Sequence, residues 1–206
     1  KYADLSYYQE GEYPRIGKID ANTFSQFKNL ISVKLPWRRD FQIGDYAFCG
    51  CGSLTSVYAY TNAYDALSDE GLMYVSNVGV KAFMGTSIRC SKIGTDAQSL
   101  GTISTQAFYG CTGITELTID NVSNIDSLAF ENCSYLARLT FGDDVYAISS
   151  NAFKGCANLQ AIHIGKNVPK YTFWNTIFPA SLGALETITV SAYNANYLST
   201  ATNCLV

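Results

Sequence analysis

The stretch AFYGCTGITELTI, residues 107–119, returns twice in the same chain, as AFENCSYLARLTF at 129–141 and AFKGCANLQAIHI at 152–164. Each copy begins with Ala-Phe, has a cysteine three residues after the Phe, and places apolar residues six, nine and eleven positions after it. Internal repetition at fixed spacing is the signature of a repeat architecture. The repeat therefore decides the fold.

The repeat extends along most of the chain once an aliphatic residue five positions before the Phe is added to it. Five copies fit this frame without a gap, at 19–35, 43–59, 103–119, 125–141 and 148–164. A sixth copy, 78–93, is one residue short. A seventh lies between Val168 and Val190, and its Phe is either Phe173 or Phe178.

Each repeat contains two stretches that suit a β-strand. The end of the repeat alternates inward and outward positions and favours β-formers, as in LARLTF (136–141). A weaker stretch surrounds the opening aliphatic residue, as in DVYAI (144–148). Because Phe108, Phe130 and Phe153 are 22 and 23 residues apart, the pattern predicts a solenoid. Equivalent strands of successive coils would pair in parallel about 4.8 Å apart.

The fixed residues of the repeat are predicted to face the interior of the coil. Burial of each Phe contributes on the order of 2–3 kcal/mol, and the Ala beside it must be small where the chain turns inward. A thiol at the next inward position acts as a small hydrophobe, and Thr86 and Phe27 replace it in two copies. A disulfide or a metal site is the alternative. We expect a buried ladder of thiols that form no disulfide: Cys51, Cys111, Cys133 and Cys156.

Composition argues against several classes of partner. The net charge is −3 and the pI is about 5.1, whereas nucleic acids and anionic lipids attract concentrated Lys and Arg. No run of 18 apolar residues occurs. The seven cysteines show no zinc-ligand spacing. We therefore predict no nucleic-acid partner, no membrane insertion, no metal and no cofactor.

The motif IGDYAFCGCGSLTSV (43–57), with its relatives from 103, 125 and 148, resembles the BspA-like leucine-rich repeat family, also called the treponemal type. The unit of that family is written around I-G-x-x-A-F-x-x-C-x-x-L-x-x-I-x-I-P, and the resemblance covers about residues 16–190. It implies a right-handed leucine-rich-repeat solenoid of parallel β-strands, loops and short helical turns. The chain departs from the family pattern in its shortened third copy, in the insertion at 60–77, and in a Pro after the strand only at Pro36.

We expect a single domain over residues 1–206, with about seven repeats at 19–190. Terminal coils of a solenoid need covering, so residues 1–18 are predicted to be the N-terminal cap and 191–206 the C-terminal cap. The tyrosines of the first segment suit capping, and alternatively stacking on sugars: Tyr2, Tyr7, Tyr8 and Tyr13. The insertion 60–77 is either a functional loop or decoration.

The residues on either side of the first apolar position of each strand are predicted to face solvent. We name the best of them the outer strip and take it as the candidate ligand face: Ser56, Tyr58, Glu116, Thr118, Arg138, Thr140, His163, Thr187 and Thr189. The same reasoning assigns Cys90 and Lys92 of the short copy to this face. Solenoids use such rows for binding, but Thr and Tyr also stand there simply because they suit strands.

The sequence contains little that resembles catalytic machinery. His163, the only histidine, is at an outward position, whereas Cys133 and Cys156 are predicted to face inward. A Cys-His pair would need both on one side. No H-E-x-x-H, Gly-rich phosphate loop or calcium loop occurs. We therefore predict no catalytic residue and no enzymatic activity.

The family resemblance supplies the functional expectation. Members are typically secreted or surface-anchored proteins of host-associated bacteria, Bacteroides-like ones especially, with suggested roles in adhesion. This implies an extracellular or cell-surface, adhesin-like protein that binds a host matrix or cell-surface protein through the solenoid face. A glycan-binding module and a structural spacer that displays another domain are the alternatives.

Overall fold

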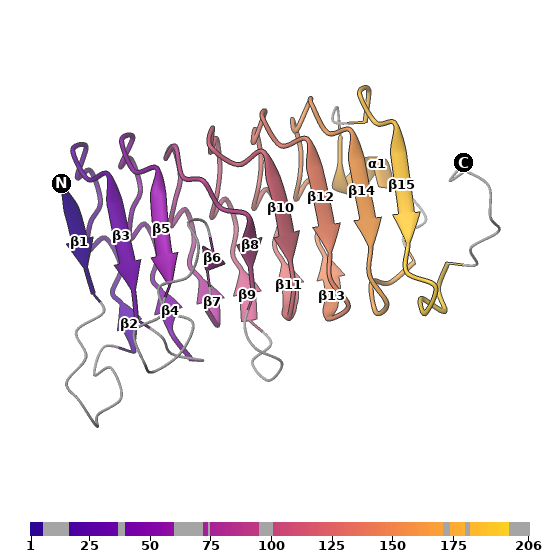
Figure 1. Cartoon of the computed structure of the whole chain (residues 1–206), viewed down its shortest axis with the longest axis horizontal. Coiled ribbons are helices and arrows are strands. Elements are labelled where there is room, and N and C mark those ends of the chain that lie inside the picture. The colour runs from indigo at the N-terminus through magenta and orange to yellow at the C-terminus, as the bar shows by residue number, and fades with distance from the viewer. Residues whose placement is uncertain are drawn as a thin grey trace.

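A computed structural model describes residues 1–5, 17–36, 40–59, 72–73, 75–94, 101–170, 174–179 and 182–197. Their strands lie side by side along one long axis, from the N-terminal to the C-terminal end of the molecule (Figure 1). Every strand pairing in this part of the chain is parallel. The predicted parallel β-solenoid is confirmed.

The ends of the repeats form the longer of two strand ladders, which we call the main ladder. It consists of β1 (Tyr2–Asp4), β3 (Ser32–Leu35) and β5 (Ser56–Ala59) in one sheet, and of β6 (Leu72–Met73), β8 (Lys92–Ile93), β10 (Glu116–Ile119), β12 (Arg138–Phe141), β14 (Ala161–Ile164) and β15 (Thr187–Val190) in another. An isolated bridge between Ser56 and Arg89 joins the two sheets. β-Branched and aromatic residues at alternate positions make these segments strands.

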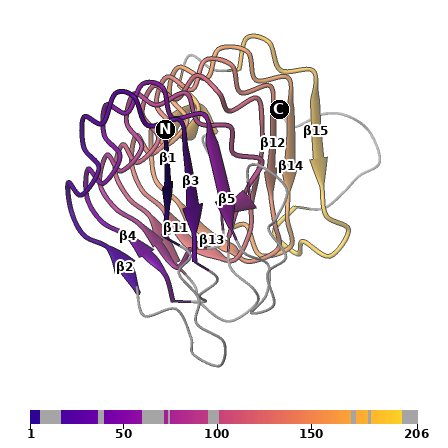
Figure 2. The same cartoon turned by 60° about the vertical axis from the view of Figure 1, so that its left-hand side comes forward.

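The weaker stretches form the second ladder on another side of each coil (Figure 2). Its strands are β2 (Lys18–Ile19), β4 (Gln42–Ile43), β7 (Asn77–Val78), β9 (Gly101–Ile103), β11 (Val122–Ile125) and β13 (Val145–Ile148). Their last residues point inward and are buried, as Ile125 and Ile148 show. Both predicted extended stretches of the repeat are therefore strands.

The main ladder is irregular at the shortened copy, as the sequence indicated. β6, which lies within the insertion 60–77, pairs with β8. The short copy also corrects one expectation, because Cys90 is buried rather than outward. The short copy has one residue fewer between Thr86 and Ile93 than the next copy has between Cys111 and Ile119. Within it Cys90 is buried and Ser91 is exposed.

A column of stacked phenylalanine rings fills the interior. Adjacent ring centroids are 5.0 to 5.2 Å apart along the column of Phe24, Phe48, Phe83, Phe108, Phe130, Phe153 and Phe178. The rings of Phe108, Phe130 and Phe153 are parallel to within 1°. The predicted inward column is confirmed. Phe178 belongs to it because the short helix α1 (Trp174–Ile177) precedes it in the last coil.

The turn that contains each Phe forms a further hydrogen-bonded row between coils. The Phe130 N–H donates to the Ala152 carbonyl at 2.8 Å, and the Phe108 N–H donates to the Ala129 carbonyl at 2.8 Å. From the coil of Phe24 to the coil of Phe153, each coil has two left-handed residues here, two positions before and two after the Phe. In the coil of Phe130 these are Leu128 (φ 63°) and Asn132 (φ 60°).

The inward cysteines are buried thiols without a disulfide, as expected. They also bind the preceding coil, which the sequence did not indicate. The thiols of Cys51, Cys111, Cys133 and Cys156 each donate to the carbonyl of the Phe one coil earlier, over 2.9 to 3.3 Å. Burial raises the pKa of Cys111 and of Cys156 to about 12 and that of Cys133 well above its usual value.

The two ends of the described solenoid differ. At the C-terminal end, the buried Asn194 side chain donates to the carbonyls of Gly165 and Val168, and the Tyr197 hydroxyl donates to the Pro169 carbonyl. At the N-terminal end, β1 lies inside the segment expected to be a cap and pairs with β3. The cap boundaries at 18 and 191 stay predictions. Tyr7, Tyr8, Tyr13, Phe173 and most of the insertion lie outside the described residues.

Candidate binding surface

The outer strip lies on the solvent side of the main ladder. Strand alternation puts Leu117 in the core, whereas its neighbours Glu116 and Thr118 point away from it. The same alternation holds in β12 and β14. Sequence reasoning therefore assigned the outward positions of these strands correctly.

Register brings most of the strip into two rows across four coils. One row contains Glu116, Arg138, Ala161 and Thr187; the other contains Thr118, Thr140, His163 and Thr189. Ser56 and Tyr58 lie on β5, next to Ser32 and Lys34 of β3. Because β5 belongs to the other sheet of the main ladder, this pair lies apart from the four-coil group.

The charges on this face are largely neutralised by one another. Arg138 Nε lies 3.2 Å from Glu116 Oε1, and both side chains are about two-thirds exposed. Such exposed pairs contribute about 0–1 kcal/mol to stability. The pair therefore orders the two side chains but adds little to the stability of the fold. Lys92 pairs with Asp120 at 3.7 Å in the neighbouring row.

Hydroxyls and one imidazole complete the four-coil group. His163 Nδ1 lies 2.8 Å from the Thr189 hydroxyl, and Thr118 and Thr140 continue that row. The thiol of Cys156 is buried in the same coil and donates to the Phe130 carbonyl, so it points into the core. The face can therefore donate and accept hydrogen bonds, and it holds no activated nucleophile among the described residues.

Three contributors to this surface were missed from the sequence. Asp120 follows β10 and pairs with Lys92, Arg89 bridges to Ser56, and Asp4 of β1 pairs with Lys34 at 3.4 Å. An acidic residue directly after a strand was a usable signal for Asp120. Residues 2–4 belong to none of the seven aligned copies, so the repeat frame could not place β1.

Other candidate sites receive no further support in the described part of the chain. No group of three potential metal ligands occurs there. No helix among the described residues is long and apolar enough to cross a membrane. The insertion tyrosines Tyr60, Tyr64 and Tyr74 lie outside the described residues.

Comparison with known proteins agrees with this architecture. The model of the BspA type leucine rich repeat region matches residues 12–70 and 73–200, in six copies. A crystal structure of a T. pallidum leucine-rich repeat protein has a TM-score of 0.51 at 19% identity, covering 91% of this chain and 68% of that one. A Bacteroides ovatus leucine-rich repeat protein has a TM-score of 0.45 at 22% identity, covering 84% and 48%. No curated protein sequence matches the chain.

Proposed function

Because the chain belongs to the BspA-type leucine-rich repeat family, we propose that it is a non-enzymatic, adhesin-like binding protein of the cell surface or extracellular space. Its partner is a protein of a host matrix or of a cell surface. The outer strip is the contact face. Leucine-rich repeats are protein-interaction scaffolds, and most of the strip is held in register across four coils.

One observation supports this assignment above the others: the four-coil register of β10, β12, β14 and β15. It holds two rows of polar side chains at strand spacing on a rigid ladder. Side chains fixed by their scaffold lose little conformational entropy when a partner binds. Arg138 and Tyr58 belong to residue types enriched among interface hot spots.

The test is a triple variant, Tyr58→Ala, Arg138→Ala and His163→Ala, measured by biolayer interferometry against a panel of immobilised matrix and cell-surface proteins. We expect the wild-type chain to bind at least one panel member and the variant to bind it at least about tenfold more weakly, a loss of about 1.4 kcal/mol. The melting temperature of the variant shows whether the fold is intact.

A control variant carries Tyr146→Ala, which changes an exposed aromatic residue on β13 of the second ladder. It is expected to bind like the wild type. Equal binding by the triple variant and the wild type would exclude the strip as the contact face.

The five exposed tyrosines among the described residues lie on five separate elements. Tyr2 is in β1, Tyr46 is in the turn before Phe48, Tyr135 is on another turn, Tyr146 is in β13, and Tyr193 follows β15. The glycan alternative would be favoured by a glycan-array signal that disappears when exposed tyrosines are replaced. Absence of binding in both assays would leave the spacer alternative.

A further inference from the structure

The second ladder carries a row of uncharged polar side chains on the solvent side of its strands. The last residue of each strand is buried, and the residue before it faces outward. Strand register brings these outward residues together across four consecutive coils. Figure 2 shows this side of the coils, away from the main ladder. We call the four residues the polar row: Gln42 of β4, Asn77 of β7, Thr102 of β9 and Asn124 of β11.

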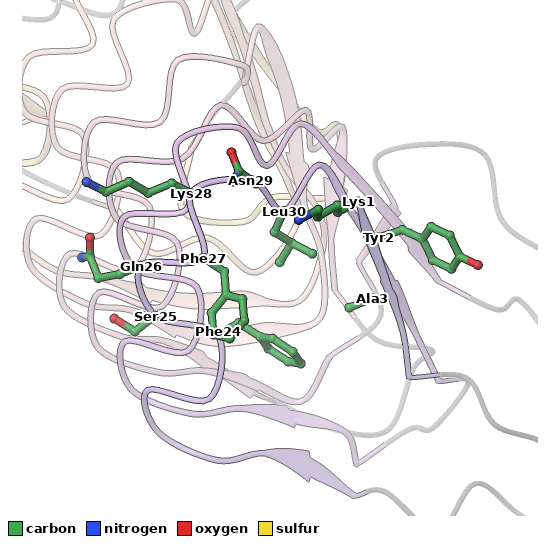
Figure 3. A pocket seen from close by; sticks show the side chains of 10 residues that line it. All are labelled: Lys1, Tyr2, Ala3, Phe24, Ser25, Gln26, Phe27, Lys28, Asn29 and Leu30. Carbon is green, nitrogen blue, oxygen red and sulfur yellow. The ribbon is translucent and has the colours of Figure 1, made fainter.

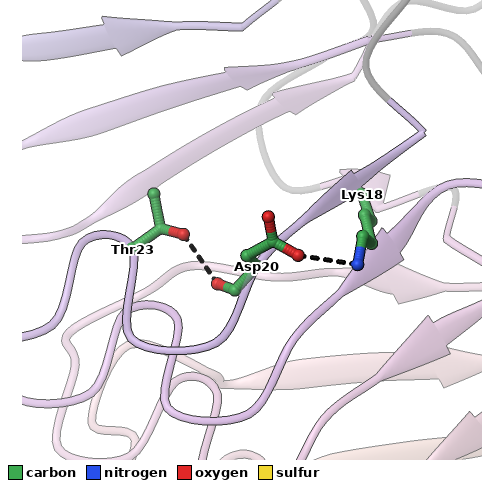
Figure 4. A network of polar contacts seen from close by, with 3 residues as sticks. All are labelled: Lys18, Asp20 and Thr23. Atoms are coloured by element: carbon green, nitrogen blue, oxygen red, sulfur yellow. Dashed lines mark hydrogen bonds and ion pairs between the residues drawn. The ribbon is translucent and has the colours of Figure 1, made fainter.

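The polar row has a limit at each end. Before it, Lys18 of β2 is in register with Gln42, and the Lys18 ammonium is paired with the Asp20 carboxylate at 2.7 Å (Figure 4). After it, Ala147 of β13 is in register with Asn124 and has no hydrogen-bonding side chain. No member of the row is charged, whereas the outer strip contains an acidic and a basic residue. The two faces therefore suit different ligands.

The polar row has hydrogen-bonding capacity that the fold does not use. The side chains of Gln42, Asn77 and Thr102 donate to no described residue and accept from none. Gln42 is exposed and the other two are half-buried. Asn124 Nδ2 donates to the Asp126 carboxylate, which orients the Asn124 amide. Because an amide and a hydroxyl can each donate and accept, every coil of the row offers both functions to a ligand.

The spacing of the row indicates the shape of that ligand. Neighbouring parallel strands are about 4.8 Å apart, which is close to the length of one sugar residue in an extended β-1,4-linked chain. An extended peptide places side chains of one face about 6.7 Å apart, so it would not stay in register with the coils. A nucleic acid would need Lys and Arg, and the row contains neither.

The chemistry of a neutral sugar also matches the row. Sugar hydroxyls donate and accept hydrogen bonds and carry no charge, like the side chains that would face them. The cavity at the first coil does not suit such a chain, because residues 1–3 and 24–30 line it and it does not extend along several coils. The rings of Phe24 and Phe27 lie close together there (Figure 3).

We propose that the polar row binds a neutral, extended, β-1,4-linked polysaccharide that lies along the solenoid axis, with one sugar residue per coil. In each coil the side chain of the row exchanges hydrogen bonds with the hydroxyls of the sugar beside it. This site is separate from the outer strip and goes beyond the protein partner proposed above. It needs no exposed tyrosine, so it also differs from the glycan alternative considered there.

Isothermal titration calorimetry with β-1,4-linked glucose oligosaccharides tests the proposal. Affinity is expected to rise from two sugars to four and to change little from four to six, with a Kd on the order of 0.1–1 mM for cellohexaose. Maltohexaose has the same composition but α-1,4 linkages and a curved shape, and it is expected to bind at least tenfold more weakly. Absence of saturable binding by cellohexaose up to about 5 mM, or equal binding of the two hexasaccharides, would overturn the proposal.

Variants of the row test which side chains make the contacts. Gln42→Ala and Asn77→Ala, separately, are expected to weaken cellohexaose binding about three- to tenfold, the loss of one or two neutral hydrogen bonds. Gln160→Ala is the matched control, because it removes an exposed amide directly before β14 of the main ladder. Ala147→Asn extends the row by one coil, so five sugars should then bind more tightly than four. Melting temperatures show whether each variant is folded, and unchanged binding by both row variants would contradict the proposal.

The same titration separates this site from the outer strip. The triple variant of Tyr58, Arg138 and His163 is expected to bind cellohexaose like the wild type. Loss of sugar binding in that variant would assign the sugar to the outer strip and overturn the second site. Failure of the triple variant to alter protein binding would leave the sugar titration unaffected.

Discussion

At the scale of single residues, the turns of the solenoid depend on backbone conformations that most side chains disfavour. The position two before the Phe is left-handed in every described coil that has an Ala-Phe dipeptide, and Tyr46, Lys81, Gln106 and Leu128 are among its occupants. A left-handed residue other than Gly or Asn costs roughly 1–2 kcal/mol. The hydrogen-bonded row through these turns maintains the conformation despite that cost.

Replacing Leu128 by Asn is therefore expected to stabilise the protein by about 1 kcal/mol, because Asn adopts the left-handed region more readily. The reverse change at the equivalent position, Asn151→Leu, is expected to cost a similar amount. Urea denaturation of both variants measures the two effects. Loss of stability in Leu128→Asn would show that packing of the Leu side chain outweighs the backbone term.

The identities of the inward residues and one left-handed position of the turn were predictable from the sequence, whereas the hydrogen bonds of the thiols were not. The Ala, Phe and Cys positions recur, so their burial followed from spacing alone. The glycines two residues after the Phe also recur, at Gly50, Gly85, Gly110 and Gly155, and this signal for a left-handed turn was available. No sequence signal indicated the hydrogen bond from each thiol to the preceding coil, because that bond depends on how the coils are offset in space.

At the scale of elements, each coil is stabilised by its two neighbours. The Phe rings illustrate this, since an interior ring such as Phe130 stacks at 5.0 Å on both sides. In repeat proteins, stability is approximately a sum of coil and nearest-neighbour terms. The effect of a ring should then depend on its place in the column.

Phe130→Ala is expected to cost about 3–5 kcal/mol, the usual range for a buried Phe. Phe24→Ala is expected to cost about 1–2 kcal/mol, because its ring is only partly buried and has one stacked neighbour. Chemical denaturation monitored by circular dichroism compares the two. Equal losses would contradict the nearest-neighbour description.

Both strand ladders were predictable from the repeat, and so was an irregularity near the shortened copy, but the form of that irregularity was not. β6 comes from the insertion, and its pairing with β8 depends on the space beside β5. The last coil could not be aligned from spacing because α1 replaces part of the usual turn. The outer strip was identified from strand alternation. Its division into two groups follows from the break between the two sheets of the main ladder.

At the scale of the whole molecule, the buried thiols of the ladder and of Cys90 make stability depend on pH. Burial raises the pKa of Cys90, Cys111 and Cys156 to about 12, whereas unfolding returns each thiol to about 9. Below pH 9 both states keep these protons, and the pH has no effect through them. Between pH 9 and 12 the unfolded state binds fewer protons than the native state, so the free energy of unfolding falls as the pH rises.

We therefore expect stability in urea to be level from pH 7 to about 8.5 and to fall steeply above pH 9, by about 1 to 1.5 kcal/mol per pH unit for each buried thiol. A Cys111→Ala variant starts from a lower stability, since it loses the hydrogen bond to the Phe83 carbonyl. Above pH 9 its free energy of unfolding falls less steeply with pH, because one buried thiol fewer contributes. Alkylation followed by peptide mass spectrometry gives an independent check, because the ladder thiols should react at pH 8 only when the protein unfolds. An unchanged slope in the variant, or rapid labelling of Cys133 in the native protein, would contradict a protonated, buried ladder.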